Sequence, residues 1–319
     1  MTLNAYLASE VSDPDLIDLI DRIASACWKI GQVVRDSALD GNQGHAGTVN
    51  PQGEEQKPID LIADDIFRTS CVQNSNVAVL ISEEVEDITT LSTAQSGGFV
   101  VAYDPLDGSS NLDVNLSVGS IFAISRLGAD LDPLPEGRSL ECAGYAIYGP
   151  STMLVLTFGA RVVGFTLDVT AEDYVLTQAD MRIPAEASEF AINVSRSRHW
   201  DAQVSAYVEG CIAGPTGPRG KAFNMRWTAS MVADVHRILM RGGVFLYPTD
   251  AENQAQGGKL RLFYEAFPMA MITEVAGGRA SNGQTDILDV TATSAHQRTS
   301  VILGARDEVT HFDTLKSHT

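Results

Sequence analysis

Two apolar runs in this chain each end in closely spaced carboxylates, and this pattern constrains the fold more than any other feature. The run 77–82 leads into the pair Glu83-Glu84. The run 98–103 leads into Asp104, with Asp107 shortly after it. Short continuous apolar runs are typical of buried strands, and in α/β sheets functional side chains gather beyond the carboxyl ends of strands. The sequence therefore predicts an α/β fold with an acidic site at these strand ends.

The stretch Asp104-Pro-Leu-Asp107-Gly-Ser-Ser-Asn111 combines groups that suit a cation with groups that suit an anion. Paired carboxylates suit hard divalent cations, which prefer oxygen ligands. A Gly-Ser-Ser turn offers backbone N–H groups and hydroxyls to an anion such as phosphate. Metal and phosphate sites side by side indicate metal-assisted phosphoryl chemistry. The alternative is a solvated turn, since Asp, Pro, Gly and Ser are ordinary turn residues; taken alone, the stretch fits both interpretations equally well.

A third acidic cluster, residues 54–65, lies upstream of both strand ends and includes Asp60 at the expected start of a helix that ends near Gln73. Crowded carboxylates repel one another and are costly to bury unpaired, so bound cations are the natural compensation. Three acids in or near these clusters are instead expected to be surface charges. They are Glu55, Asp64 and Asp87.

The charge balance restricts the partners of this chain. Its 319 residues carry a formal net charge of -19, which argues against nucleic acid or an anionic membrane as a partner. No apolar run approaches the length of a membrane span, and the N-terminus shows neither a signal-peptide nor a transit-peptide pattern. The four cysteines share no metal spacing and are expected to be buried thiols. These features predict a cytoplasmic protein, or a plastid protein if a transit peptide was removed.

The length suits two modest domains or one large α/β unit. Asp13-Pro14 is a typical start of a helix, and another helix is expected over 231–240. Residues 40–53 are rich in Gly, Asn and Gln, which indicates either a gate over the site or a disordered connector. We place the two halves of the chain at residues 1–186 and 187–319.

The order of the acidic motifs resembles the Mg-dependent, lithium-sensitive sugar-phosphate phosphatase superfamily. The Trp-Asp motif expected of its inositol monophosphatase branch is not found in the matching context. The chain instead resembles class I fructose-1,6-bisphosphatases along nearly its whole length. The segments that carry this likeness are 144–156, 230–237, 243–248, 259–265, 268–270, 288–290 and 296–298. The resemblance implies a layered α-β-α-β-α fold in two halves, with the metal site between them.

Position by position, the resemblance implies a site that hydrolyses fructose 1,6-bisphosphate. The implied metal ligands are Glu83, Asp104, Leu106, Asp107 and Glu265. The implied water-activating acids are Asp60 and Glu84, with Glu54 in the place of a loop Asp. The implied substrate contacts are Gly108, Ser109 and Ser110 at the 1-phosphate with Arg261 near it, Ser230 and Met231 at the sugar, Asn193, Tyr247 and Lys259 at the 6-phosphate, and Arg226 at a neighbouring subunit's 6-phosphate. The resemblance further implies two or three Mg²⁺ ions per subunit, with Mn²⁺ or Zn²⁺ as substitutes, a homotetramer, and a role in gluconeogenesis or the Calvin cycle.

The chain departs from the family pattern near the 6-phosphate. Trp227 and Arg196 each stand where the family has Tyr. Arg196 would either replace the lost contact with a charge-assisted one or favour a different sugar. Sedoheptulose 1,7-bisphosphate therefore stays an alternative substrate, and a non-catalytic sugar-phosphate sensor on the same fold is the alternative from another class. Two further cations in a Gly/Pro-rich loop, Arg219 and Lys221, are expected to be solvated rather than bound to phosphate.

Overall fold

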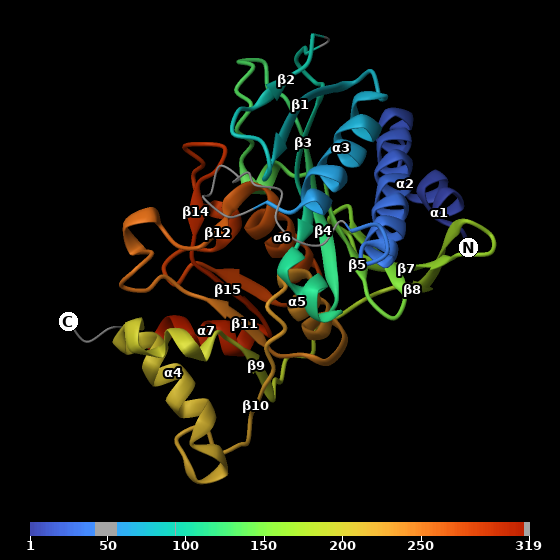
Figure 1. Ribbon diagram of the computed structural model, residues 1–319. Coiled ribbons are helices and arrows are strands. Elements are labelled where there is room, and N and C mark those ends of the chain that lie inside the picture. The colour runs from blue at the N-terminus through green and yellow to red at the C-terminus, as the bar shows by residue number, and fades with distance from the viewer. Residues whose placement is uncertain (42–55, 93, 316–319) are drawn as a thin grey trace.

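Helices and sheets alternate in layers through the molecule, for which a computed structural model describes residues 1–41, 56–92 and 94–315. The layers are α1–α3, a large sheet, α5 with α6, a smaller sheet, and α4 with α7 (Figure 1). The α-helices are α1 Leu3–Glu10, α2 Pro14–Asp36, α3 Pro58–Val72, α4 Ala202–Ile212, α5 Met231–Arg241, α6 Phe267–Val275 and α7 Arg306–Thr314. This is the layered α-β-α-β-α fold that the family resemblance implies.

The larger sheet has eight strands in the order β2-β1-β3-β4-β5-β6-β7-β8. These strands are β1 Val77–Ser82, β2 Thr89–Thr90, β3 Phe99–Asp107, β4 Val118–Arg126, β5 Cys142–Tyr148, β6 Thr152–Thr157, β7 Val162–Asp168 and β8 Asp173–Gln178. β1 and β3 run parallel to each other, and every residue of both strands is buried. Burial on both faces explains why their sequences are continuous apolar runs rather than alternating ones.

The smaller sheet has five strands in the order β10-β9-β11-β15-β13, and β12 pairs with β14 separately. These strands are β9 Glu189–Ala191, β10 Asn224–Met225, β11 Val244–Tyr247, β12 Leu260–Arg261, β13 Arg279–Ser281, β14 Arg298–Thr299 and β15 Val301–Gly304. The division of the chain at residues 186 and 187 stays a prediction.

Three apolar clusters fill the spaces between the layers. One packs α1–α3 on the large sheet, one surrounds α5 and α6 between the sheets, and one lies under α4 and α7. The predicted helix start is confirmed: Oδ1 of Asp13 accepts hydrogen bonds from the N–H groups of Asp15 at 2.9 Å and Leu16 at 3.4 Å. All four cysteines are buried and free. Among the helices of the described residues, none has the length and apolar character needed to cross a membrane.

The expectation of solvated charge is wrong for Arg219, whose side chain is 13% exposed, whereas the side chain of Lys221 stays 40% exposed. Both pair with Glu308 of α7, whose carboxylate is 2.6 Å from Arg219 and 3.1 Å from Lys221. The hydroxyl of Tyr207 on α4 also donates to Glu308 at 2.8 Å. Glu308 is only 2% exposed. The Gly/Pro-rich loop is thus tied to α7 by a buried anion, which loop composition alone does not show.

Glu308→Gln is expected to reduce the free energy of unfolding by about 3 kcal/mol, since it removes the buried anion that pairs with the largely covered Arg219. Burial acts to raise the pKa of Glu308, but the hydrogen bonds from Arg219, Tyr207 and Lys221 outweigh it and the net pKa is lowered. A lowered pKa means that this stabilisation is present above the ordinary value of 4.5 and is lost as the pH falls below it. Urea unfolding at pH 7 and pH 4 measures both effects.

The matched control for this variant is Asp307→Asn, which removes an exposed carboxylate at the preceding position of α7. It should change the free energy of unfolding by less than about 0.5 kcal/mol. Equal effects of the two variants would show that the buried ion cluster does not stabilise the fold.

Candidate active site

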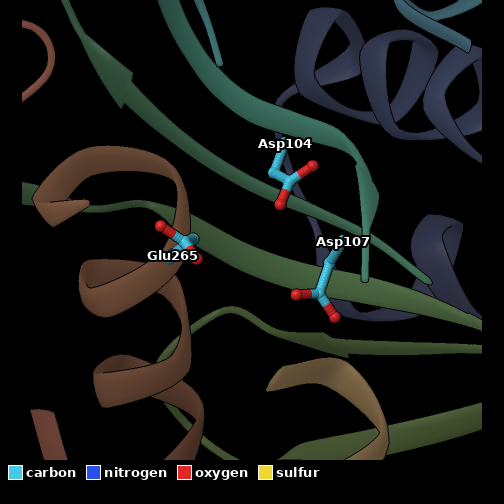
Figure 2. Close-up of side chains that lie close together, drawn as sticks. All are labelled: Asp104, Asp107 and Glu265. Atoms are coloured by element: carbon cyan, nitrogen blue, oxygen red, sulfur yellow. The ribbon is translucent and has the colours of Figure 1, made fainter. Parts of the chain in front are cut away.

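A bulge at the end of β3 brings Asp104 and Asp107 onto one face of the sheet. Asp104 pairs with Ile121 of β4 and Asp107 with Gly119, so three steps along β3 oppose two steps along β4. In a regular strand, residues three apart point to opposite faces, and one extra residue reverses this relation. Candidate ligand oxygens of Asp104, Asp107 and Glu265 lie within 4.8 Å of one another, and Figure 2 shows the three carboxylates around a common space.

Glu265 reaches this space from the second half of the chain. It lies in a π-helical turn, Leu262–Ala266, that continues directly into α6. An apolar run alone does not distinguish this turn from a regular α-helix, and π turns often occur at functional sites. Oε2 of Glu265 accepts a hydrogen bond from the backbone N–H of Arg261 at 2.7 Å, which restrains the carboxylate.

Asp107 also joins the end of β3 to the N-terminus of α5. Its Oδ2 accepts hydrogen bonds from Ser230 Oγ at 2.6 Å and from the Val232 N–H at 2.9 Å. Its Oδ1 accepts one from the Met231 N–H at 3.2 Å. The first N–H groups of a helix have no partner within the helix, so they and the helix dipole favour a carboxylate at this place.

The turn after Asp107 packs closely against the start of α5. Gly108 has a φ of 75°, a left-handed conformation that favours glycine, and a Cβ there would lie 2.7 Å from the Cβ of Ser230. The ammonium group of Lys57 donates to the carbonyl oxygen of Ser109 at 3.2 Å and to Asp113 at 2.7 Å. Backbone shape and a buried cation therefore both hold the turn in place.

These elements surround a pocket of about 430 Å³. The predicted site residues that line it are Asp60, Glu83, Glu84, Asp104, Leu106, Asp107, Gly108, Ser109, Ser110, Asn193, Ser230, Met231, Tyr247, Lys259, Arg261 and Glu265. Arg226 is exposed and is not among the lining residues. Glu54 and residues 42–53 of the predicted loop lie outside the described residues.

Several lining residues were not singled out from the sequence. They are Gln56, Lys57, Ala229, Phe245 and Leu260. Gln56 is the most informative of them, because its Nε2 donates a hydrogen bond to Oε2 of Glu84 at 2.5 Å. The sequence gives little indication of this contact, because Gln56 is a neutral residue inside an acidic run.

Asp64 was expected on the surface, and that expectation is wrong. The residue is 8% exposed. Its Oδ1 accepts hydrogen bonds from Ser82 Oγ at 2.5 Å and from the Tyr103 hydroxyl at 3.0 Å. Asp64 follows Asp60 by about one turn of α3, so the two acids share a helix face. Helical spacing predicts this, provided that it is applied to the acidic residues as well as to the apolar ones.

The three clustered carboxylates are electrostatically unfavourable by themselves. Burial, followed by repulsion from Glu83, Asp107 and Glu265, holds the pKa of Asp104 well above its usual range. Burial likewise raises the pKa of Asp107 and of Glu265, although hydrogen bonds to each carboxylate partly offset it. Charges this crowded in a buried site need compensating positive charge.

Asp60 and Glu84 are perturbed in the same direction. Burial raises the pKa of Asp60 to about 6, against the hydrogen bond from the Lys57 N–H. Burial and the neighbouring Glu83 raise the pKa of Glu84 to about 8. Carboxyl groups with such values can bind and release protons near neutral pH, as a general base must.

The side chains fit a hard divalent cation. Arg261 supplies some positive charge, with its guanidinium 2.7 Å from Glu83 and 3.6 Å from Glu265. Oδ1 of Asp60 is nevertheless buried and has no hydrogen-bond partner among the described residues. A purely oxygen donor set with an unpartnered buried carboxylate oxygen is the kind of site that Mg²⁺ prefers.

The two departures from the family pattern have different surroundings. Trp227 lines the pocket and stacks on Phe245, with ring centroids 6.0 Å apart and planes 9° from parallel. Arg196 does not line this pocket. Its guanidinium forms two hydrogen bonds to Asp250, at 2.8 and 2.7 Å, and one to Glu252 at 2.6 Å. Trp227 is thus placed to contact a ligand in this pocket, whereas Arg196 lies beside Asn193 and Tyr247 in a small adjoining pocket.

Comparison with known proteins accounts for nearly the whole chain. The family descriptions "Fructose-1-6-bisphosphatase, N-terminal domain" and "Fructose-1-6-bisphosphatase, C-terminal domain" match residues 3–179 and 183–317. The chain is 48% identical over 320 residues to the class 1 fructose-1,6-bisphosphatase of Methylacidiphilum infernorum (isolate V4), covering 97% of this chain and 90% of that relative.

Solved structures agree with the sequence matches. The holo form of Leishmania major fructose-1,6-bisphosphatase superposes with a TM-score of 0.92 at 35% identity, and the apo form with 0.87 at 33%. Each comparison covers 99% of this chain and 98% of the Leishmania chain. Sequence, fold and pocket together lead to one conclusion: this chain belongs to the class I fructose-1,6-bisphosphatase family.

Proposed function

We propose that this chain hydrolyses the 1-phosphate of fructose 1,6-bisphosphate in the described pocket, with Mg²⁺ bound among the buried acids. Its family and relatives make it a phosphatase of carbohydrate metabolism whose products are fructose 6-phosphate and phosphate. One observation carries the placement of the reaction. The carboxylates of Asp104, Asp107 and Glu265 lie within 4.8 Å of one another in the pocket that the turn at Gly108 also lines.

The metal site would use ligands from both halves of the chain. They are Glu83, Asp104, the backbone carbonyl of Leu106, Asp107 and Glu265. Two or three Mg²⁺ ions, or Mn²⁺ or Zn²⁺ in their place, would shield the phosphate charge and make the attacking water more acidic. The bulge supports the inclusion of Leu106, because bulge residues are released from regular pairing with the neighbouring strand.

Asp60 and Glu84 would accept the proton of the attacking water. Oδ1 of Asp60 has no hydrogen-bond partner among the described residues and offers an acceptor. The raised pKa of each acid makes its carboxylate a stronger base than an exposed one. Gln56 donates a hydrogen bond to Oε2 of Glu84 and so restrains the carboxylate. Glu54 would complete the group.

The remaining contacts would orient the substrate. The backbone N–H groups and hydroxyls of residues 108–110 would bind the 1-phosphate, near Arg261. The sugar would lie against Ser230 and Met231 at the start of α5. Positioning and electrostatics contribute most of the rate in phosphoryl transfer, because little covalent assistance is needed.

The 6-phosphate would be held by residues of two subunits. Asn193, Tyr247 and Lys259 line the pocket of the same chain, whereas exposed Arg226 would reach the pocket of a neighbouring copy. We therefore propose a homotetramer. We also place it in the cytoplasm, or in a plastid if a transit peptide was removed, in gluconeogenesis or the Calvin cycle; free buried cysteines suit a reducing compartment. We propose no nucleic-acid or membrane partner.

Sedoheptulose 1,7-bisphosphate is a second candidate substrate, and Trp227 is the observation that favours it. An indole in the pocket wall replaces a hydroxyl contact with an apolar surface, which would change how the pocket binds the sugar hydroxyls. The non-catalytic sensor is disfavoured, because family membership and the acid set both indicate hydrolysis.

Phosphate release tests this proposal. The protein should release phosphate from fructose 1,6-bisphosphate in Mg²⁺, release none in EDTA, and recover when Mg²⁺ is added back. The same assay with sedoheptulose 1,7-bisphosphate compares kcat/KM for the two sugars. A preference for the heptulose would make the second candidate the main substrate, and equal activity in EDTA would rule out the metal mechanism.

A further inference from the structure

Asp64 is a buried acid without a role in the site as proposed above. It does not line the pocket, although it lies on the same face of α3 as Asp60. Adding another carboxylate close to a crowded acidic group increases repulsion, and a buried charge is costly unless hydrogen bonds compensate it. The hydrogen bonds that compensate Asp64 connect it through Ser82 to Glu84, which lines the pocket.

The chemistry of the groups fixes the direction of each hydrogen bond. An ionised carboxylate only accepts, so Ser82 donates its hydroxyl hydrogen to Asp64 at 2.5 Å. The oxygen of Ser82 is then left as an acceptor, and it receives the backbone N–H of Glu84 at 3.2 Å. The result is a series of hydrogen bonds in which the N–H of Glu84 donates to Ser82 and Ser82 donates to Asp64.

This series of hydrogen bonds lies where β1 ends. The N–H of Glu83 still donates to the carbonyl oxygen of Tyr103 on β3 at 3.2 Å, which continues the ladder of β1 by one residue. Glu84 is the next residue, and its N–H is bound by the side chain of Ser82 instead. Ser82 is 4% exposed and Asp64 8% exposed, so water does not compete freely for these bonds.

We infer that Asp64 and Ser82 are positioning residues that fix the backbone of Glu84, so that its carboxylate is held in place to accept the proton of the attacking water. This inference rests on the role proposed for Glu84. Gln56 holds the same residue from its other end, at Oε2. Backbone and side chain of Glu84 are thus anchored by separate contacts, and Asp64 acts through Ser82 without touching the substrate.

A matched pair of hydroxyl deletions tests the inference. Ser82→Ala and Tyr103→Phe each remove one of the two hydroxyl donors to Oδ1 of Asp64. Only Ser82 also binds Glu84. A purely structural role for Asp64 predicts parallel losses in both variants, whereas a positioning role predicts a catalytic loss in Ser82→Ala alone.

We expect Ser82→Ala to lower kcat for fructose 1,6-bisphosphate by about 10-fold or more, the usual effect of removing a partner that orients a site residue. KM for the sugar bisphosphate should stay within about twofold, since the proposed 6-phosphate contacts are untouched. Tyr103→Phe should keep kcat within about twofold while its Tm falls at least as much as that of Ser82→Ala. Asp64→Asn keeps an accepting oxygen and should retain more activity than Asp64→Ala.

Wild-type kcat in folded Ser82→Ala, or an equal kcat loss in Tyr103→Phe, would overturn the inference. Glu84→Gln in the same assay separates this result from the proposed function. If Glu84→Gln is active, the role of Glu84 itself is wrong, and the inference fails with it. If Glu84→Gln is inactive but Ser82→Ala is normal, only the positioning role of Asp64 and Ser82 is wrong.

Discussion

Asp104→Asn is expected to lower turnover at least ~100-fold, on the scale of losing one preorganised electrostatic group at a reacting phosphate, while stabilising the metal-free protein. Asp104 is 2% exposed, and burial and its acidic neighbours hold its pKa well above the usual range. Removing its charge relieves repulsion at the cost of a metal ligand. The hydrogen bond from the Leu106 N–H to Oδ1, at 2.9 Å, can be kept by the amide oxygen of Asn.

The stabilisation should be on the order of 1–3 kcal/mol, comparable with the cost of a poorly compensated buried polar group. Urea unfolding in EDTA measures it, and phosphate release in saturating Mg²⁺ measures the loss of turnover. Asp87→Asn is the control, because Asp87 is an exposed acid near the end of β1 and should change neither quantity. Near-normal turnover of Asp104→Asn would remove Asp104 from the metal site.

Removing the metal should make stability fall as the pH rises. Folding raises the pKa of Asp60 from 3.8 to about 6 and that of Glu84 from 4.5 to about 8. When the folded pKa lies above the unfolded one, stability is fully present below the unfolded pKa and is lost as the pH rises through the folded pKa. Each pKa unit corresponds to about 1.4 kcal/mol, so the metal-free protein should lose several kcal/mol between pH 5 and pH 8.

Thermal unfolding from pH 5 to 8, with EDTA or with Mg²⁺, checks this result. Bound cations compensate the ionised acids, so the difference in Tm between the two conditions should widen as the pH rises. Asp60→Asn should flatten the lower part of the EDTA curve, near pH 6. A difference in Tm that does not depend on pH would show that the cations are not bound by these acids.

Burial patterns made much of the fold predictable from sequence. The continuous apolar runs of β1 and β3 predict buried strands, and acids at their ends predict a site there. The capping of α2 by Asp13 follows from local residue preferences. For the two strands and the helix cap, the signal lies within a few neighbouring residues, and the structure confirms these elements.

Partners far apart in the chain were not predictable in this way. Arg219 and Glu308 are separated by 89 positions, and loop composition carries no sign of their pairing. The bulge in β3 depends on how β4 aligns with it, which periodicity within a single strand does not contain. Glu265 likewise lies far along the chain from the other acids, and only the family resemblance added it to the predicted metal ligands.

The hydrogen bonds of Asp107 would couple cation binding to sugar binding. The same carboxylate that would hold a cation also accepts hydrogen bonds from Ser230 and Met231, the residues proposed to meet the sugar. A cation that draws on this carboxylate must alter how firmly those donors are held, and by thermodynamic reciprocity a bound sugar must alter the affinity for the cation. The affinities for the two ligands should therefore be coupled, each ligand changing the affinity for the other by the same factor.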